Sequence, residues 1–195
     1  MITEVVRIAL LLIAILDPFL ATPPFLAMTK KMKDKERGKI ILDAIIIAGL
    51  VMSVFLFIGT PILDFFSISM PSFKVAGGIV IFIVGLRLVL GYEIVDEKGK
   101  KEKSTIALLL GTPLLAGPAA ITTMILTAHD YGIVSSLAGL ILALAATYTI
   151  MLLGSLIVRS IGEKGISILS RIMGLILAAF AIEFIKSGII AMLVF

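Results

Sequence analysis

An aspartate and three prolines interrupt one of the most apolar stretches of the sequence, at Asp17, Pro18, Pro23 and Pro24. A proline lacks the N–H group that the helical ladder needs and clashes with the carbonyl four residues before it, so each one frees backbone polar groups. Lipid cannot satisfy such groups, and a carboxylate deep inside a membrane helix is usually functional. The pattern therefore predicts that an interrupted transmembrane helix binds a small polar solute or a cation here.

A second pair of prolines, Pro113 and Pro118, repeats the five-residue spacing of Pro18 and Pro23 in another apolar stretch. The residue before each of these four prolines is one that can cap a helix: Asp17, Thr22, Thr112 and Gly117. A capping residue followed by proline is typical of a helix start, where free N–H groups and the positive end of the dipole favour an anion. We therefore predict restarted half-helices that form an anion-binding site.

Small residues at these interruptions, such as Ala21, Ala116 and Gly117, leave room for little more than a compact solute. The predicted solute-binding residues are Asp17, Pro18, Ala21, Thr22, Pro23, Thr112, Pro113, Ala116, Gly117, Pro118, Thr122 and Thr123. A coupling cation is predicted at the Asp17 carboxylate and at the freed carbonyls near Leu16 and Gly111. The alternative is that the prolines only kink the helices for packing and that Asp17 is only a cap.

The composition indicates a membrane protein. Of 195 residues, 60% are hydrophobic and only 15% are charged, with a mean hydropathy of +1.21. The absence of cysteine and the single His129 predict no metal site and no cofactor beyond a coupling Na+ or H+. The sequence also lacks Asn and Gln, which together with the missing cysteine is typical of a thermophilic prokaryote.

Six stretches are long and apolar enough to cross a bilayer, which takes about 20 residues in a helix. They lie at about 3–29, 44–63, 71–91, 104–128, 131–158 and 166–192. The first is too long for a cleavable signal peptide. The expected fold is an all-α integral membrane protein with six transmembrane helices.

Basic residues gather in the loops at 30–39 and 92–103 and in the connection that holds Arg159, Lys164 and Arg171. The loops at 64–70 and 129–131 hold none. The positive-inside rule therefore places both termini outside a cell membrane. The basic residues are short-loop residues mixed with acidic ones, so no nucleic-acid partner is predicted.

The two proline-containing stretches also indicate an internal repeat. The run from Pro18 to Pro23 matches the run from Pro113 to Pro118 at four of six positions, a shift of 95 residues. We predict that 1–97 and 98–195 are two three-helix repeats within one membrane domain. Because three is odd, the halves are inverted, and helices 1 and 4 are discontinuous in equivalent places.

Other charged and small residues are predicted to be structural. Arg87 is expected to extend toward the membrane surface, Glu183 to pair with Lys186 three residues later, and His129 to have no role. Ser135, Gly139, Ala143 and Thr147 recur at every fourth position, a face that lets another helix approach closely.

The sequence resembles the MarC family of bacterial and archaeal inner-membrane proteins, which includes small neutral amino acid transporters. The resemblance covers the whole chain and is carried by Asp17-Pro18, by PLLAGPAAITT at 113–123 and by RIMGLILAA at 171–179. The chain departs from the family pattern at Leu20, Ala21 and Ala119. The resemblance implies transport of glycine, alanine or similar amino acids with Na+ or H+, by alternating access.

Two other classes stay open: a channel or other small-solute exporter with the same broken helices, and a structural membrane subunit without transport. An enzyme is not expected, because no second carboxylate faces Asp17 and His129 lies in an outer loop. The expected partners are a small amino acid, membrane lipid and, because six short helices enclose little space, further copies of the chain.

Overall fold

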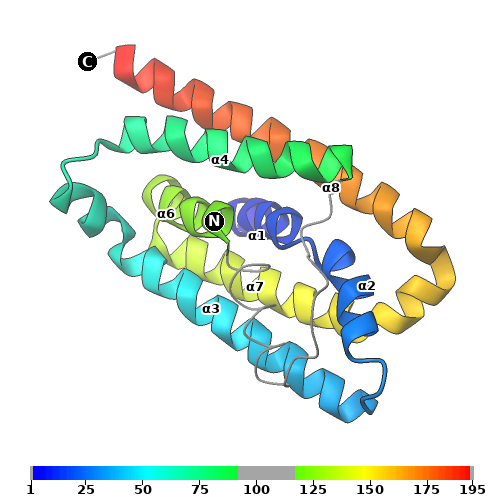
Figure 1. Ribbon diagram of the computed structural model, residues 1–195. Helices are drawn as coiled ribbons and strands as arrows, with labels where there is room; N and C mark the ends of the chain where they lie inside the picture. The colour runs from blue at the N-terminus through cyan, green and yellow to red at the C-terminus, as the bar shows by residue number, and fades with distance from the viewer. Residues whose placement is uncertain (1, 92–116, 194–195) are drawn as a thin grey trace.

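The computed structural model describes residues 2–91 and 117–193, and within these ranges it contains helices and no strand. The seven helices in this part of the chain are α1 (Ile2–Leu16), α2 (Pro18–Met28), α3 (Asp34–Phe65), α4 (Met70–Leu90), α6 (Pro118–Tyr131), α7 (Ile133–Leu152) and α8 (Gly154–Leu193) (Figure 1). The predicted all-α class is confirmed.

Five helical stretches in the described ranges are long and apolar enough to cross a membrane. They are Ile2–Leu26, Asp34–Phe65, Met70–Leu90, Ile133–Leu152 and Lys164–Leu193. The predicted span at 104–128 lies partly outside the described ranges, and its described part belongs to α6. The 3+3 inverted repeat of 1–97 and 98–195 therefore stays a prediction.

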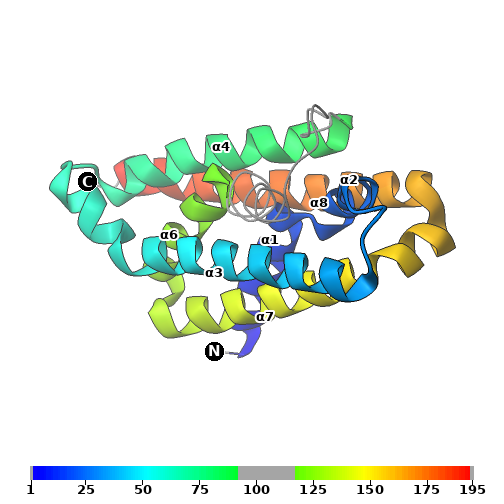
Figure 2. The same cartoon turned by 60° about the horizontal axis from the view of Figure 1, so that its bottom comes forward.

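In Figure 1 the helices form three tiers, with α4 and α8 along one side, α3 and α7 along the other, and α1 and α6 between them. Figure 2 shows α1 and α6 side by side and running in opposite directions. Helix α2, which carries Pro18, Pro23 and Pro24, lies toward one end of the molecule next to α8.

Glycines let α4 and α8 pack against each other in antiparallel fashion with almost no side-chain layer between them. A Cβ atom on Gly85 would lie 2.8 Å from the Gly174 carbonyl oxygen, and one on Gly78 would lie 2.9 Å from the Ala181 carbonyl oxygen. Such close backbone approach is a usual way to join membrane helices, because lipid gives little hydrophobic drive for their association. These two helices form a tightly joined pair.

The predicted small-residue face of α7 packs against α1. A Cβ on Gly139 would lie 2.6 Å from Ile8, and the Ser135 hydroxyl donates to the Glu4 carboxylate at 3.3 Å. Just past the end of α7, a Cβ on Gly154, the first residue of α8, would lie 2.5 Å from Thr22 in α2. The prediction that another helix approaches the small-residue face of α7 is confirmed.

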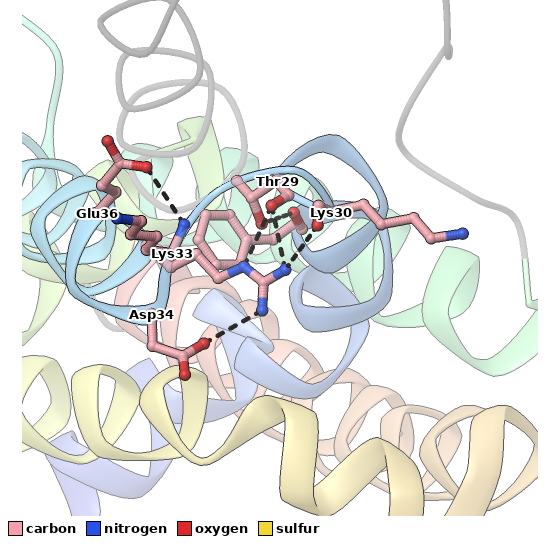
Figure 3. A network of polar contacts seen from close by, with 7 residues as sticks. Thr29, Lys30, Lys33, Asp34 and Glu36 are labelled. Carbon is pink, nitrogen blue, oxygen red and sulfur yellow. Dashed lines mark hydrogen bonds and ion pairs between the residues drawn. The ribbon is translucent and has the colours of Figure 1, made fainter.

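The turn between α2 and α3 is held by Arg37. Its Nε and Nη2 donate to the Thr29 carbonyl at 3.2 and 3.1 Å, and Nη2 also donates to the Lys30 carbonyl at 3.4 Å (Figure 3). These carbonyls follow the end of α2, where a helix has unpaired acceptors and its dipole favours a cation. Arg37 therefore fixes the orientation of α2 relative to α3.

Replacing Arg37 by Gln should lower the free energy of unfolding by about 1–3 kcal/mol, the usual effect of removing a charged donor from half-buried acceptors. The Arg37 side chain is 21% exposed, so its loss would not be fully compensated by water. Thermal or denaturant unfolding in detergent would measure the change. Lys35→Gln, at an exposed position in the same turn of α3, serves as the control and should have no effect; equal stability of the two variants would contradict this role.

The structure corrects the predicted connection between the last two spans. Instead of a loop over 159–165, α7 ends at Leu152 and α8 starts at Gly154, with one non-helical residue inside it, Gly162. The φ angle of Gly162 is 67°, a value that a residue without Cβ adopts easily. A single glycine thus makes the bend for which the sequence predicted a loop.

Candidate functional site

The helical backbone is interrupted at Asp17. Helix α1 ends at Leu16 and α2 begins at Pro18, and between them Asp17 has a φ angle of 35°. This conformation is unusual for a residue other than glycine, although Asp and Asn are the side chains that tolerate it best. Asp17 is only 5% exposed and lies inside the candidate span Ile2–Leu26.

The Asp17 carboxylate uses one oxygen to cap α2. Oδ1 accepts the Leu20 amide and the Ser170 hydroxyl, each at 3.2 Å, and the Phe19 amide is a further donor to the carboxylate. Oδ2 is buried and has no hydrogen-bond partner among the described residues. A buried carboxylate oxygen without a partner is costly, so this atom is suited to bind a cation, an ammonium group or a proton.

The capping by Asp17 changes the predicted role of the first helix start. Because the amides of Phe19 and Leu20 already face the carboxylate, the beginning of α2 is not an open anion site. The predicted restart after Thr22 is wrong as well, since α2 continues through Pro23 and Pro24 to Met28. The Thr22 hydroxyl donates backward to the Pro18 carbonyl at 2.6 Å instead of capping a new helix.

The same interruption frees carbonyl groups near Leu16, one of the two places where a coupling cation was predicted; the other, Gly111, lies outside the described residues. The Leu20 amide turns to the Asp17 side chain, so it does not serve the Leu16 carbonyl four residues before it. Pro18 has no N–H to offer the Ala14 carbonyl. Carbonyl oxygens and one carboxylate oxygen are the ligand types that a hard cation prefers.

The beginning of α6 is a helix start without a side-chain cap. Gly117 is the N-cap residue and Pro118 is the first helical residue, as predicted. The next two amides, of Ala119 and Ala120, have no acceptor within the helix, and Gly117 has no side chain to supply one. Ala119 is 3% exposed and Ala120 is fully buried, so these amides favour an anion at this point.

Arg7 and Leu11 of α1 line one pocket with Thr127 and Tyr131 of the antiparallel helix α6. If this register continues along the two helices, we expect Thr123, one turn before Thr127, to lie near the level of Ile15. The start of α6 is then expected at about the depth of the Asp17 interruption. The Thr123 hydroxyl is fully buried and has no partner among the described residues.

The other predicted site residues have different positions. Thr122 packs against α4, where its methyl group lies against Gly77 and leaves no room for a Cβ. Ala21 is buried in the apolar core beside the cap. Gly111, Thr112, Pro113 and Ala116 lie outside the described residues.

Sequence reasoning missed a buried hydroxyl at the interruption. Ser170 on α8 donates to Asp17 across 153 positions of sequence. Thr147, on the predicted small-residue face of α7, is buried, and its hydroxyl has no partner among the described residues. The available signal was an isolated hydroxyl residue in an apolar span, which is too common in membrane helices to identify a site.

Comparison with known proteins places the whole chain in one group. The profile described as "MarC family integral membrane protein" matches residues 2–193. The UPF0056 inner membrane protein YhgN of Escherichia coli is 35% identical over 189 residues, covering 95% of this chain and 96% of the relative. The UPF0056 membrane protein MJ1677 of Methanocaldococcus jannaschii is 36% identical over 186 residues, covering 90% and 91%. No solved structure matches the chain.

Proposed function

Because the chain belongs to the MarC family of integral membrane proteins, we propose that it is a secondary transporter of small neutral amino acids such as glycine or alanine, coupled to Na+ or H+. The observation that carries the proposal is the buried Asp17 carboxylate, which interrupts a membrane span and has one oxygen without a partner among the described residues. Such a group at a broken helix is a usual feature of ion-coupled transport sites.

The amino acid would be held by opposite charges at the two interruptions. Its carboxylate would accept hydrogen bonds from the Ala119 and Ala120 amides at the uncapped start of α6. Its ammonium group, or the coupling cation, would bind Oδ2 of Asp17 with help from the Leu16 carbonyl. The buried alanines at the start of α6 would limit the size of the side chain.

Alternating access would come from movement of the interrupted helices against a rigid partner. The α4–α8 pair is joined by backbone contacts at Gly85 and Gly174 and is suited to be that partner. Asp17 accepts a hydrogen bond from Ser170 on α8. Binding of a ligand to the other oxygen of Asp17 would therefore change the contact between α2 and α8. A rocking motion around the site follows the pattern of other transporters with broken helices.

Uptake by proteoliposomes tests the proposal. The purified protein should accumulate radiolabelled alanine or glycine against its gradient when an inward Na+ or proton gradient is imposed. Passive flux without accumulation would favour a channel, and uptake no faster than in protein-free vesicles would favour a structural subunit. Both outcomes would contradict coupled transport.

Thr123→Val should raise the half-saturating concentration for the amino acid or the cation by about 3- to 10-fold, the effect of losing one hydrogen bond to a ligand. The valine has nearly the same shape, and the hydroxyl has no partner among the described residues, so stability should not fall. Thr149→Val is the control, because its exposed hydroxyl only donates to the Ala145 carbonyl. If both variants transport like the wild type, Thr123 has no part in binding.

A further inference from the structure

A pocket of about 610 Å³ lies between α1, α6 and α8. Its walls include Arg7 and Leu11 from α1, Thr127 and Tyr131 from α6, and Ile176 and Glu183 from α8. The volume is in the range of small-molecule sites. The pocket is located where α1 begins and α6 ends, on the face of the molecule away from the α2–α3 turn.

The pocket lies within two turns of the Asp17 interruption when counted along α1 and α8. Leu11 and Ile176 are each six residues from the hydrogen-bonded pair Asp17 and Ser170, a distance of about 9 Å along a helix. On α6, Thr123 is one turn beyond the wall residue Thr127 in the same direction. Its hydroxyl has no partner among the described residues.

The pocket presents one side chain of each charge on mostly apolar walls. Arg7 and Tyr131 both line the pocket, and both carboxylate oxygens of Glu183 accept from Lys186, at 3.1 and 3.0 Å. The predicted Glu183–Lys186 pair is confirmed, but its neighbour Arg7 was missed by the sequence analysis. An entering ammonium group would take the place of Lys186 at Glu183, and a carboxylate would bind Arg7, so a zwitterion supplies a partner for each of the two wall residues.

We infer that this pocket is the vestibule of the transport site, where Arg7 binds the carboxylate and Glu183 the ammonium group of a zwitterion before it moves to Asp17. The inference rests on the proposed function and adds a second site to it. A free amino acid and the headgroup of phosphatidylethanolamine both carry one anionic group and one ammonium group. The charge pair, the pocket volume and the route to Asp17 favour the free amino acid.

The absence of native cysteine makes the vestibule testable by single-cysteine labelling. Ala179→Cys places a thiol on the pocket wall, whereas Leu175→Cys and Ile182→Cys, seven residues apart on exposed positions of α8, place it outside the pocket. A membrane-impermeant methanethiosulfonate cation should modify Ala179→Cys at least about tenfold faster, because the reactive thiolate forms in water and not in lipid. Equal rates would overturn the vestibule.

Protection by alanine tests the charge pair. Saturating alanine should slow modification of Ala179→Cys, and adding Arg7→Gln or Glu183→Gln should raise the protecting concentration about tenfold or more, the effect of a lost charged hydrogen bond. Arg87→Gln, at an exposed position outside the pocket, should leave protection unchanged. Protection that neither pocket variant alters would overturn recognition by Arg7 and Glu183.

Vesicles of different lipid composition test whether the pocket binds a lipid headgroup or a free amino acid. In vesicles of phosphatidylglycerol alone, labelling should be as fast as in mixtures with phosphatidylethanolamine, and alanine should still protect. Slower labelling with phosphatidylethanolamine and no protection by alanine would assign the pocket to a lipid headgroup and overturn the vestibule. Protection without any uptake would keep the zwitterion site and reject the proposed transport, so the two failures are distinguishable.

Discussion

Asp17→Asn should reduce coupled uptake of alanine by at least about tenfold, equivalent to 1.4 kcal/mol or more, and should abolish its dependence on the cation. The amide keeps an oxygen for the Leu20 amide and Ser170, and Asn both caps helices well and tolerates the φ of 35°. What it removes is the charge on the oxygen that has no partner among the described residues. Initial rates in proteoliposomes with imposed gradients would measure the loss.

Two comparisons separate this effect from misfolding. The thermal unfolding of Asp17→Asn should resemble that of the wild type, whereas Asp17→Ala should be less stable by about 1–3 kcal/mol, because it loses the cap and strains the backbone. Asp64→Asn, at an exposed position near the end of α3, should transport normally. Unchanged cation-dependent uptake by Asp17→Asn would remove Asp17 from coupling.

Gly85→Leu should prevent α4 and α8 from packing and leave little folded protein, and Gly85→Ala should lower the free energy of unfolding by about 1–3 kcal/mol. Even one methyl group would lie 2.8 Å from the Gly174 carbonyl oxygen and 2.9 Å from the Ala178 amide nitrogen. These are backbone atoms, so only a shift of a whole helix could make room. Unfolding in detergent and size-exclusion profiles would measure both variants.

Gly38→Ala provides the matched control for a glycine inside a helix. Its Cβ would meet only the end of the Leu152 side chain, at an ordinary 3.5 Å. The gain in helix propensity should then leave the protein equally stable or more stable by up to about 1 kcal/mol. If Gly85→Ala were as stable as Gly38→Ala, the α4–α8 contact would not be the tight joint described above.

The sequence was sufficient for features that depend on local chemistry. Apolar length located the described spans, and the pairing of a capping residue with proline located the helix boundary at Asp17 and the helix start at Pro118. The four-residue spacing of small residues from Ser135 to Thr147 identified the face of α7 that packs against α1. Each of these signals acts within one or two turns of helix.

Features that depend on distant residues could not be predicted. Pro23 follows a capping residue, yet packing keeps α2 helical there, with Thr22 bonded backward and pressed against Gly154. Ser170 became a partner of Asp17 only because α8 folds back onto the interruption. Arg7 received no prediction from the sequence, and only the fold places it in one pocket with Glu183. In each case the deciding neighbour is far away in sequence.

The most direct test of the account is equilibrium binding of radiolabelled alanine to the purified protein, with competition by propionate and by ethylamine. A site that holds the carboxylate at the start of α6 and the ammonium group at Asp17 requires both charges on one molecule. We expect unlabelled glycine and alanine to displace the label and the two singly charged analogues to fail at the same concentrations. Displacement by propionate or ethylamine as effective as by alanine, or no saturable binding at all, would contradict the account.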